Sequence, residues 1–221
     1  LRETMADQRW RKFRWNPLSN PKAWRRFEAE LVEALPGLGA PIESMAQAIE
    51  VRASCRALAE RYVGVHICSL LFANLFFQLC EGALEASGHR ALALDALRPV
   101  EQSWTVRTNQ ALWRLGRGEM SEVDFLAQYG HRAASSWELF SPRWAEAPSR
   151  VQVLAEAAAQ HADPAALAAD QAARAQAARD GLPLGLRQLV GLTQDYLLLR
   201  EDQRYRFDQL LWAWKQAYLW T

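Results

Sequence analysis

The chain has 221 residues, of which 50% are hydrophobic and 23% charged, the composition of an ordinary globular protein with a sizeable core. Lys and Arg number 26 and Asp and Glu 25, so the formal net charge of +1 provides no overall field to attract nucleic acid or an anionic membrane. Cys55, Cys68 and Cys80 lack the close C-x-x-C spacing of a structural zinc site. We interpret them as reduced core residues and expect a cytoplasmic protein.

Helical periodicity covers nearly the whole chain, and no segment alternates apolar and polar residues between turn signals as a strand does. The sequence therefore predicts an all-α fold, a multi-helix bundle that forms a single domain over residues 1–221. Pro and Gly mark the breaks between helices. The expected helices cover residues 22–34, 42–61, 62–87, 104–116, 121–127, 148–180 with a break at Asp163-Pro164, and 184–218.

Local residues mark several helix ends. Residues 35–41 hold two Pro and two Gly and predict an interhelical loop. Gly88 can take a positive φ and should stop the helix before it. Ser121 and Asp163 are expected N-caps, and Pro164 suits the first helical position after Asp163.

The apolar segment 63–79 contains four polar residues, which makes it a poor membrane span. Three of its polar residues, His66, Asn74 and Gln78, are separated by eight and four positions, and we place them near one line of a helix. The segment is therefore predicted to be a buried helix with one polar seam. His66 is either a satisfied core histidine or a hydrogen-bonding group in a pocket.

The first 26 residues carry eight basic and two acidic side chains, interleaved with Trp10, Phe13 and Trp15. A basic aromatic arm at about residues 1–21 can bind phosphates or a membrane surface. It can equally dock its aromatics on the protein body, which we favour because the segment is short and uncapped. We expect neither nucleic acid nor a membrane as a partner.

Ten tryptophans are a heavy load for this length. Trp has a large apolar ring with one hydrogen-bonding end, so these residues either wall a ligand pocket or fill space between helices. The chain has no G-x-x-x-x-G-K-[ST] or G-x-G-x-x-G loop, no H-E-x-x-H helix and no G-x-S-x-G elbow. These absences argue against a self-sufficient enzyme, and no metal site is predicted.

Two segments resemble a known family. Residues 125–148 read FLAQYGHRAASSWELFSPRWAEAP and resemble the "YGHR…E…PRW-E-P" signature of phosphoenolpyruvate-utilising enzymes. Residues 196–220 read YLLLREDQRYRFDQLLWAWKQAYLW and are similar to their "REdqRyyw" helix. The relatives are phosphoenolpyruvate-synthase-like phosphotransferases, including rifampin phosphotransferase, and the resemblance covers roughly residues 91–220. Ala133 departs from it, because relatives often have Gly there.

The resemblance implies an enzyme with three parts: an ATP-grasp domain, a helical acceptor-binding domain, and a swivelling domain whose histidine carries phosphate. This chain resembles the central helical part alone, because it lacks the nucleotide loop and the "T-S-H" segment. His131 is therefore not the phosphate carrier. The implied partners are a small hydroxylated acceptor and the other two domains, and ATP and Mg²⁺ belong to the complete enzyme rather than to this chain.

The same resemblance suggests catalytic residues on the last helix and in the loop before it. Arg200 and Arg204 are four residues apart on one helical face, with Asp208 on the same line, so the two guanidinium groups can clamp a phosphoryl group. The alternative is an exposed salt-bridge ladder of these three residues. In the loop, His131 or Glu138 is a hydrogen-bond partner or general base for the acceptor hydroxyl, unless the loop is a structural latch.

The acceptor is expected between the polar-seam helix and the last helix. The predicted substrate-binding residues are His66, Asn74, Gln78, Trp137, Glu138, Tyr196 and Phe207. The rival interpretation is a non-catalytic helical scaffold whose Trp-rich surface docks a partner protein. A ligand-sized pocket would separate the two.

Overall fold

The structure is a computed structural model that describes residues 16–17, 19–135 and 137–220. The α-helices are α3 (Asn20–Leu38), α4 (Met45–Ala86), α5 (Ala93–Ala96), α6 (Trp104–Gly116), α7 (Glu122–Tyr129), α8 (Pro148–Ala159), α9 (Pro164–Asp180) and α10 (Leu184–Leu219). Short 3₁₀ turns, η1 (Arg90–Leu92) and η2 (Trp144–Glu146), precede α5 and α8. The described residues form no strand, and the predicted all-α fold with a long C-terminal helix is confirmed.

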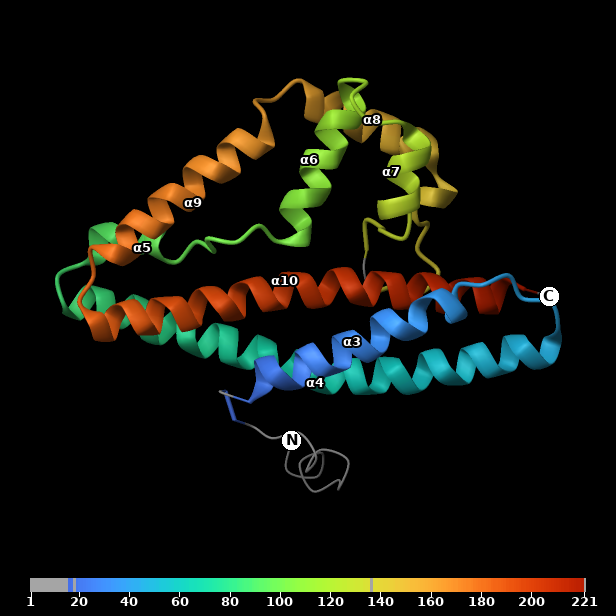
Figure 1. Ribbon diagram of the computed structural model, residues 1–221, viewed down its shortest axis with the longest axis horizontal. Coiled ribbons are helices and arrows are strands. Elements are labelled where there is room, and N and C mark those ends of the chain that lie inside the picture. The colour runs from blue at the N-terminus through green and yellow to red at the C-terminus, as the bar shows by residue number, and fades with distance from the viewer. Residues whose placement is uncertain (1–15, 18, 136, 221) are drawn as a thin grey trace.

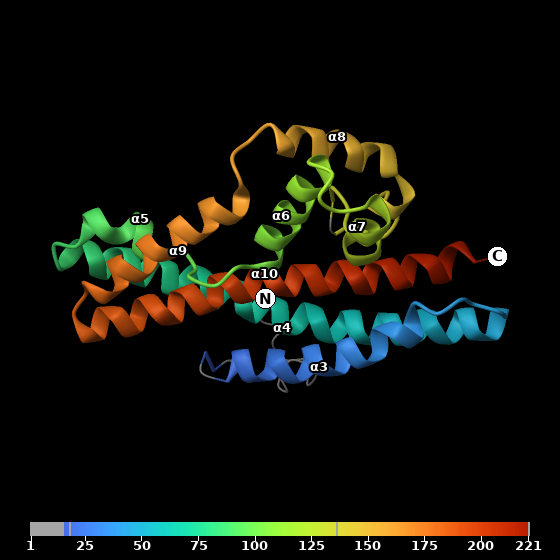
Figure 2. The ribbon, with the colours of Figure 1, turned by 45° about the horizontal axis from the view of Figure 1, so that its top comes forward.

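Two layers make up the molecule (Figures 1 and 2). In the first layer α3, α4 and α10 extend along the longest axis, and α4 runs antiparallel to the other two. In the second layer α6 leads away from α10, α8 crosses the far side, and α9 returns to the beginning of α10. The loop between α7 and α8 extends back toward α10 and so contacts the first layer, which is distant from it in sequence.

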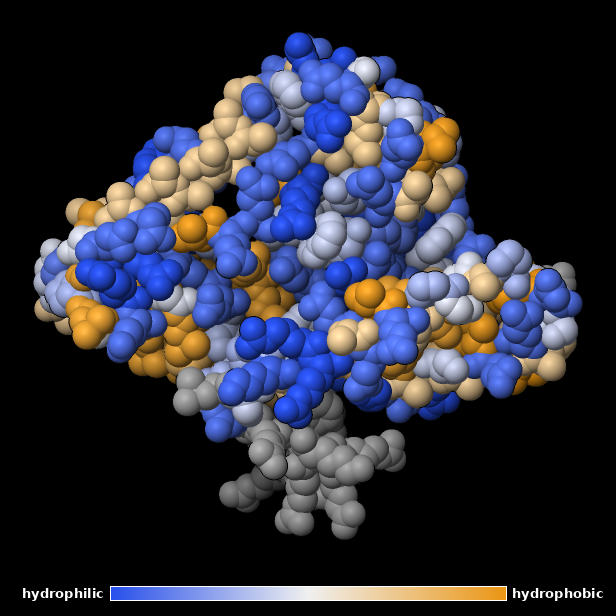
Figure 3. Space-filling view, in the orientation of Figure 1, coloured by the Kyte–Doolittle hydropathy of each residue, from blue (hydrophilic) through white to orange (hydrophobic). Residues whose placement is uncertain are grey.

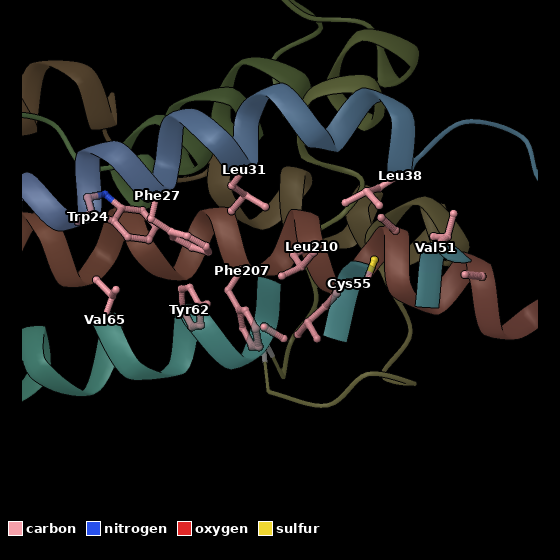
Figure 4. Packing of buried hydrophobic residues seen from close by; sticks show 14 residues of the cluster. Trp24, Phe27, Leu31, Leu38, Val51, Cys55, Tyr62, Val65, Phe207 and Leu210 are labelled. Carbon is pink, nitrogen blue, oxygen red and sulfur yellow. The ribbon is translucent and has the colours of Figure 1, made fainter. Parts of the chain in front are cut away.

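The main core lies between α3, α4 and α10 (Figure 4). Trp24, Phe27 and Leu31 recur at helical spacing on the inner face of α3 and are at most 3% exposed. They pack against Tyr62 of α4 and Phe207 of α10, whose rings stack at 4.2 Å between centroids. Each such side chain contributes about 1.5–3 kcal/mol on burial. The outer face of α3 is hydrophilic and appears deep blue over its N-terminal half in Figure 3.

The predicted boundary between two helices at residues 61 and 62 is wrong, because α4 is one helix of 42 residues. No Pro and no capping residue interrupts it there, and Gly64 inside a helix costs only about 1 kcal/mol. The packing of α4 against α10 and α3 contributes far more free energy of stabilisation than this cost. The helix α3 also continues past the predicted end at residue 34, through Pro36 to Leu38, since a proline in the last turn removes a single backbone hydrogen bond.

Three predicted helix ends are confirmed. Gly88 follows α4 with a φ of 78°, a left-handed conformation that favours glycine. The Ser121 hydroxyl accepts from the Asp124 amide at 3.0 Å and caps α7, which continues to Tyr129. The Asp163 carboxylate accepts from the Ala165 amide at 2.8 Å and caps α9.

By length and composition α4 could cross a membrane, and 44% of its most apolar window is buried inside the protein. A core helix has the same composition, because one face must be apolar to pack on its neighbours. A second apolar row at four-residue spacing remains exposed on α4. This row consists of Val63, Ile67, Leu71, Leu75 and Leu79.

The second layer has a thinner core. The helix α9 is rich in Ala and appears as a pale orange strip in Figure 3. Alanine favours helix formation but buries little apolar area. Of the basic arm predicted at residues 1–21, residues 1–15 and 18 lie outside the described part, and α3 has already begun at Asn20.

Candidate functional site

The loop at residues 130–147, here called the charged loop, is ordered by its own backbone. The Trp144 amide donates to the Arg132 carbonyl at 2.8 Å, and the Ala145 amide donates to the Gly130 carbonyl at 2.9 Å. Next to these bonds, toward the middle of the loop, Ala133 and Arg143 form an isolated antiparallel bridge. The two ends of the loop are therefore held together, and the middle of the loop projects toward α10.

A buried carboxylate on α10 fastens this loop. Asp208 is fully buried, and its two oxygens lie 3.5 Å from Nη1 of Arg143 and 3.4 Å from Nη1 of Arg132. Arg143, also fully buried, donates a further hydrogen bond from Nη2 to the Glu138 carbonyl at 3.0 Å. The predicted exposed ladder of Arg200, Arg204 and Asp208 is therefore wrong, because Asp208 faces the charged loop and not solvent.

A second contact between the charged loop and α10 lies seven residues, about two turns, farther along α10. Lys215 of α10 donates to the Glu146 carboxylate at 2.6 Å and to the Ser141 carbonyl at 3.1 Å. Burial alone would raise the pKa of Glu146, but hydrogen bonds from the Arg143 amide and from Lys215 outweigh it and lower that pKa. The charged loop thus packs on α10 as a latch at two points.

The latch carries Trp137 onto the first layer. The Trp137 ring lies 5.4 Å from the His66 ring, 5.3 Å from Phe207 and 6.5 Å from Tyr62, measured between centroids. Tyr62 in turn stacks on His66 at 5.1 Å. We call these four residues the Trp137 cluster. Trp137 is 55% exposed whereas His66 is 4% exposed, so the cluster extends from the core to the surface.

Arg200 and Arg204 lie beside this cluster on α10. Arg204 is exposed, and the Arg200 side chain is 38% exposed, with its guanidinium 3.1 Å from the Glu201 carboxylate. Burial lowers the pKa of His66; the hydrogen bond to Gln203 acts against this, and the charges of Arg200 and Arg204 lower the pKa further. Two basic side chains therefore lie near a buried imidazole that is held in its neutral form.

A chain of buried polar groups supports His66 from behind. Nδ1 of His66 lies 2.8 Å from Oε1 of Gln203, and Nε2 of Gln203 donates to the Ser69 hydroxyl at 2.8 Å. That hydroxyl lies 2.9 Å from Oδ1 of Asn20 and 3.0 Å from the Val65 carbonyl. The chain joins α3, α4 and α10. Gln203 was not among the predicted residues, because nothing in the local sequence indicates its partner 137 positions away.

The predicted polar seam is wrong for two of its three residues. Asn74 and Gln78 are exposed, whereas His66 and Ser69 are buried. Each residue turns an α-helix by about 100°, so positions eight and twelve after His66 drift by about 80° and 120° from it. The structure therefore does not bring Asn74 and Gln78 to the Trp137 cluster.

Two further predicted substrate-binding residues lie apart from the cluster. Tyr196 is fully buried against Phe72 and Phe76, and its hydroxyl donates to the Pro17 carbonyl, which is a packing role. Glu138 is exposed, and it contributes its backbone carbonyl to Arg143. Of the predicted set, the structure thus brings together His66, Trp137 and Phe207, with Arg200 and Arg204 beside them.

His131, the third predicted catalytic residue, faces another side of α10. Its ring meets the Tyr205 ring edge-on at 4.8 Å, and Tyr205 and Phe207 point in nearly opposite directions because two residues rotate a helix by about 200°. Burial, followed by the charges of Arg132, Arg143 and Arg206, lowers the pKa of His131 to about 3. His131 is 8% exposed and neutral, so its geometry is that of a latch residue.

The described residues also contain a hollow of about 460 Å³, lined by residues of α6, α7 and the turn between them. The lining residues are Arg114, Gly118, Glu119, Met120, Ser121, Asp124 and Gln128. None of the predicted site residues lines it. Within the described part of the chain, no three His, Cys, Asp or Glu side chains gather as metal ligands.

The family model "Rifampicin phosphotransferase fourth domain" matches residues 121–201. No curated protein and no solved structure matches the chain. The matched segment runs from the start of α7 to Glu201 of α10, and it includes the charged loop and Arg200. The match thus supports a phosphoenolpyruvate-utilising, phosphotransferase-like family for this chain.

Proposed function

We propose that this chain is the acceptor-binding helical domain of a phosphoenolpyruvate-synthase-like phosphotransferase, and that it binds a small hydroxylated organic molecule at the Trp137 cluster. The observation that carries the proposal is the position of Trp137. A loop inside the family-matched segment places this indole against His66 and Phe207, beside Arg200 and Arg204.

The chemistry of the cluster fits such an acceptor. The exposed indole of Trp137 offers an apolar surface to the body of an organic molecule, and the buried rings of Tyr62 and Phe207 support it from the core side. His66 offers a polar group for a hydroxyl among these rings. Arg200 and Arg204 add positive charge, which stabilises a phosphoryl group in transit. ATP, Mg²⁺ and the carrier histidine are supplied by other domains, in the same chain or in another one.

The test is phosphoryl transfer in the enzyme reassembled with its ATP-grasp and phosphohistidine domains. The double variant Arg200→Gln/Arg204→Gln should lose about 10²–10³ in kcat, the effect of removing preorganised charge stabilisation. The matched control is Arg174→Gln on α9, whose side chain is 51% exposed and pairs with Asp170. Full turnover in the double variant would contradict the phosphate clamp.

A second candidate is a partner-docking scaffold with the same fold. It is favoured by the exposed apolar row on α4 and by Phe140, which is 60% exposed and meets the Tyr218 ring near the end of α10. Substituting Leu71 and Leu75 in that row by Gln discriminates the two. The acceptor-binding proposal expects unchanged small-molecule binding and transfer in this variant, whereas a docking scaffold would lose its partner.

A further inference from the structure

We propose that Nε2 of His66 accepts the hydrogen bond from the acceptor's hydroxyl group and takes its proton during phosphoryl transfer. This inference rests on the proposed function and names the group that recognises the hydroxyl. It is carried by the buried chain of hydrogen bonds behind the imidazole, which determines which ring nitrogen bears the hydrogen.

The amide of Gln203 gives the chain its direction. Its Nε2 donates to the Ser69 hydroxyl at 2.8 Å, so the Ser69 hydrogen is directed to the Val65 carbonyl at 3.0 Å or to Oδ1 of Asn20 at 2.9 Å. Its Oε1 lies toward His66, and an amide oxygen can only accept.

The tautomer of His66 follows in turn. Nδ1 must carry the hydrogen in order to donate to Oε1 of Gln203 at 2.8 Å. In a neutral imidazole the second nitrogen, Nε2, then holds the lone pair. Gln203 and Ser69 are positioning residues, because they act on the acceptor only through His66.

The charged and titratable groups around His66 favour this neutral form. On α10 these are Arg200, Glu201 and Arg204, and on α4 the neighbour is Tyr62, whose pKa is raised first by burial and then by Asp208. From α3 comes the uncharged Asn20, and from the charged loop the uncharged Trp137. Burial and the two arginines together lower the pKa of His66, so the imidazole is unprotonated near neutral pH.

The transfer step balances with these groups. The acceptor oxygen forms a new bond to phosphorus while the phosphorus–nitrogen bond to an N-phosphorylated histidine of the partner domain breaks, and that bond's electron pair stays on the partner's imidazole. The acceptor's hydroxyl proton moves to Nε2 of His66, which later releases it to water. Arg200 and Arg204 face the transferring phosphoryl group and do not exchange protons.

The tautomer can be measured on the chain by itself. In a long-range ¹H–¹⁵N correlation spectrum near neutral pH, His66 should show a protonated Nδ1 and an unprotonated Nε2. The chain has four histidines, and loss of one set of cross-peaks in His66→Gln assigns the signal. Gln203→Leu should abolish the preference for Nδ1–H. An Nε2–H tautomer or an imidazolium in the wild type would overturn the inference, whether or not an acceptor binds.

The proton transfer is tested by substitution in the reassembled enzyme. His66→Gln places an amide where Nε2 lies, so the acceptor should bind within about threefold while kcat falls by about 10²–10⁴. The exposed His161→Gln is the control and should turn over normally. Gln203→Glu keeps an acceptor for Nδ1–H and adds a negative charge, so the acidic limb of the kcat–pH profile should move to higher pH.

The outcomes separate the two proposals. Normal turnover in His66→Gln, with a wild type that transfers phosphate, overturns this inference and leaves the proposed function standing. A wild type that transfers to no hydroxylated acceptor overturns the proposed function, and this inference with it.

Discussion

At the scale of single residues, the most informative contact is the one between Asp208 and two guanidinium groups. Arg200, Arg204 and Asp208 recur at four-residue spacing on α10, but Arg204 is exposed whereas Asp208 is fully buried, because spacing within a helix says nothing about the segment that packs on each turn. Arg132 and Arg143 come from 65 or more positions away and turn Asp208 into a buried anchor. The contact among Arg132, Arg143 and Asp208 could therefore not be predicted from the sequence.

This anchor yields a stability prediction. Asp208→Asn leaves the buried Arg143 guanidinium and the partly buried Arg132 guanidinium without their counter-charge, so the free energy of unfolding should fall by about 3–5 kcal/mol. The comparison is Glu28→Gln, which breaks the partly exposed pair with Arg206 and should cost about 1 kcal/mol. Urea denaturation measures both. Equal losses in the two variants would show that Asp208 does not anchor the loop.

His131 gives a pH prediction of definite sign. The pKa of His131 is 6.5 in the unfolded chain and about 3 in the folded protein. Between these two pH values the unfolded chain therefore binds more protons than the folded protein does. His131 therefore weakens the fold as pH falls below about 6.5, by up to about 1.4 kcal/mol per pH unit. His131→Phe keeps the edge-on contact with Tyr205 and removes this slope.

The measurement is the difference in unfolding free energy between wild type and His131→Phe at several values between pH 4 and 7. The difference should shift steadily in favour of the variant as the pH falls. A difference that does not change with pH would mean that His131 is already protonated or exposed in the folded chain.

At the scale of elements, the helix caps and helix ends are the features that the sequence predicts well. Gly88, Ser121 and Asp163 were predicted from local chemistry and lie where expected, because each acts on backbone groups within a few residues. The continuity of α4 was not predicted, since it depends on the length of α10 alongside it. The predicted polar seam failed for a different reason, because each four-residue step along a helix drifts by about 40°, which accumulates to about 120° over twelve residues.

The contact between α6 and α8 gives an element-scale prediction. A Cβ added at Gly116 would lie 2.0 Å from the Ala155 carbonyl oxygen, which cannot move without displacing α8. Gly116→Ala should therefore cost about 1–3 kcal/mol. Gly185→Ala in the exposed first turn of α10 meets nothing within 4 Å and should be neutral or stabilise the fold by up to about 1 kcal/mol. Thermal unfolding of the two variants distinguishes these effects.

At the scale of the whole molecule, the candidate site exists because two layers meet. Tyr62, His66 and Phe207 belong to the first layer. Trp137 belongs to the charged loop of the second layer, and this loop contacts the three residues because it is held on α10 by Asp208. His66, Trp137 and Phe207 were predicted as substrate-binding residues from a resemblance and from residue type. Their meeting, and the exclusion of Asn74, Gln78 and Tyr196, required the tertiary arrangement.

The central claim is that the Trp137 cluster binds a hydroxylated organic acceptor, and calorimetric titration of the whole chain tests it most directly. The ligands are a panel of aromatic and polyketide-like alcohols, each paired with its O-methyl ether. At least one alcohol should bind saturably and more tightly than its ether. Trp137→Ala should weaken this binding by tenfold or more, about 1.4 kcal/mol, whereas Trp113→Ala, whose indole donates to the His161 carbonyl far from the cluster, should not. Absence of binding to the folded chain, or equal losses in both variants, would contradict the account.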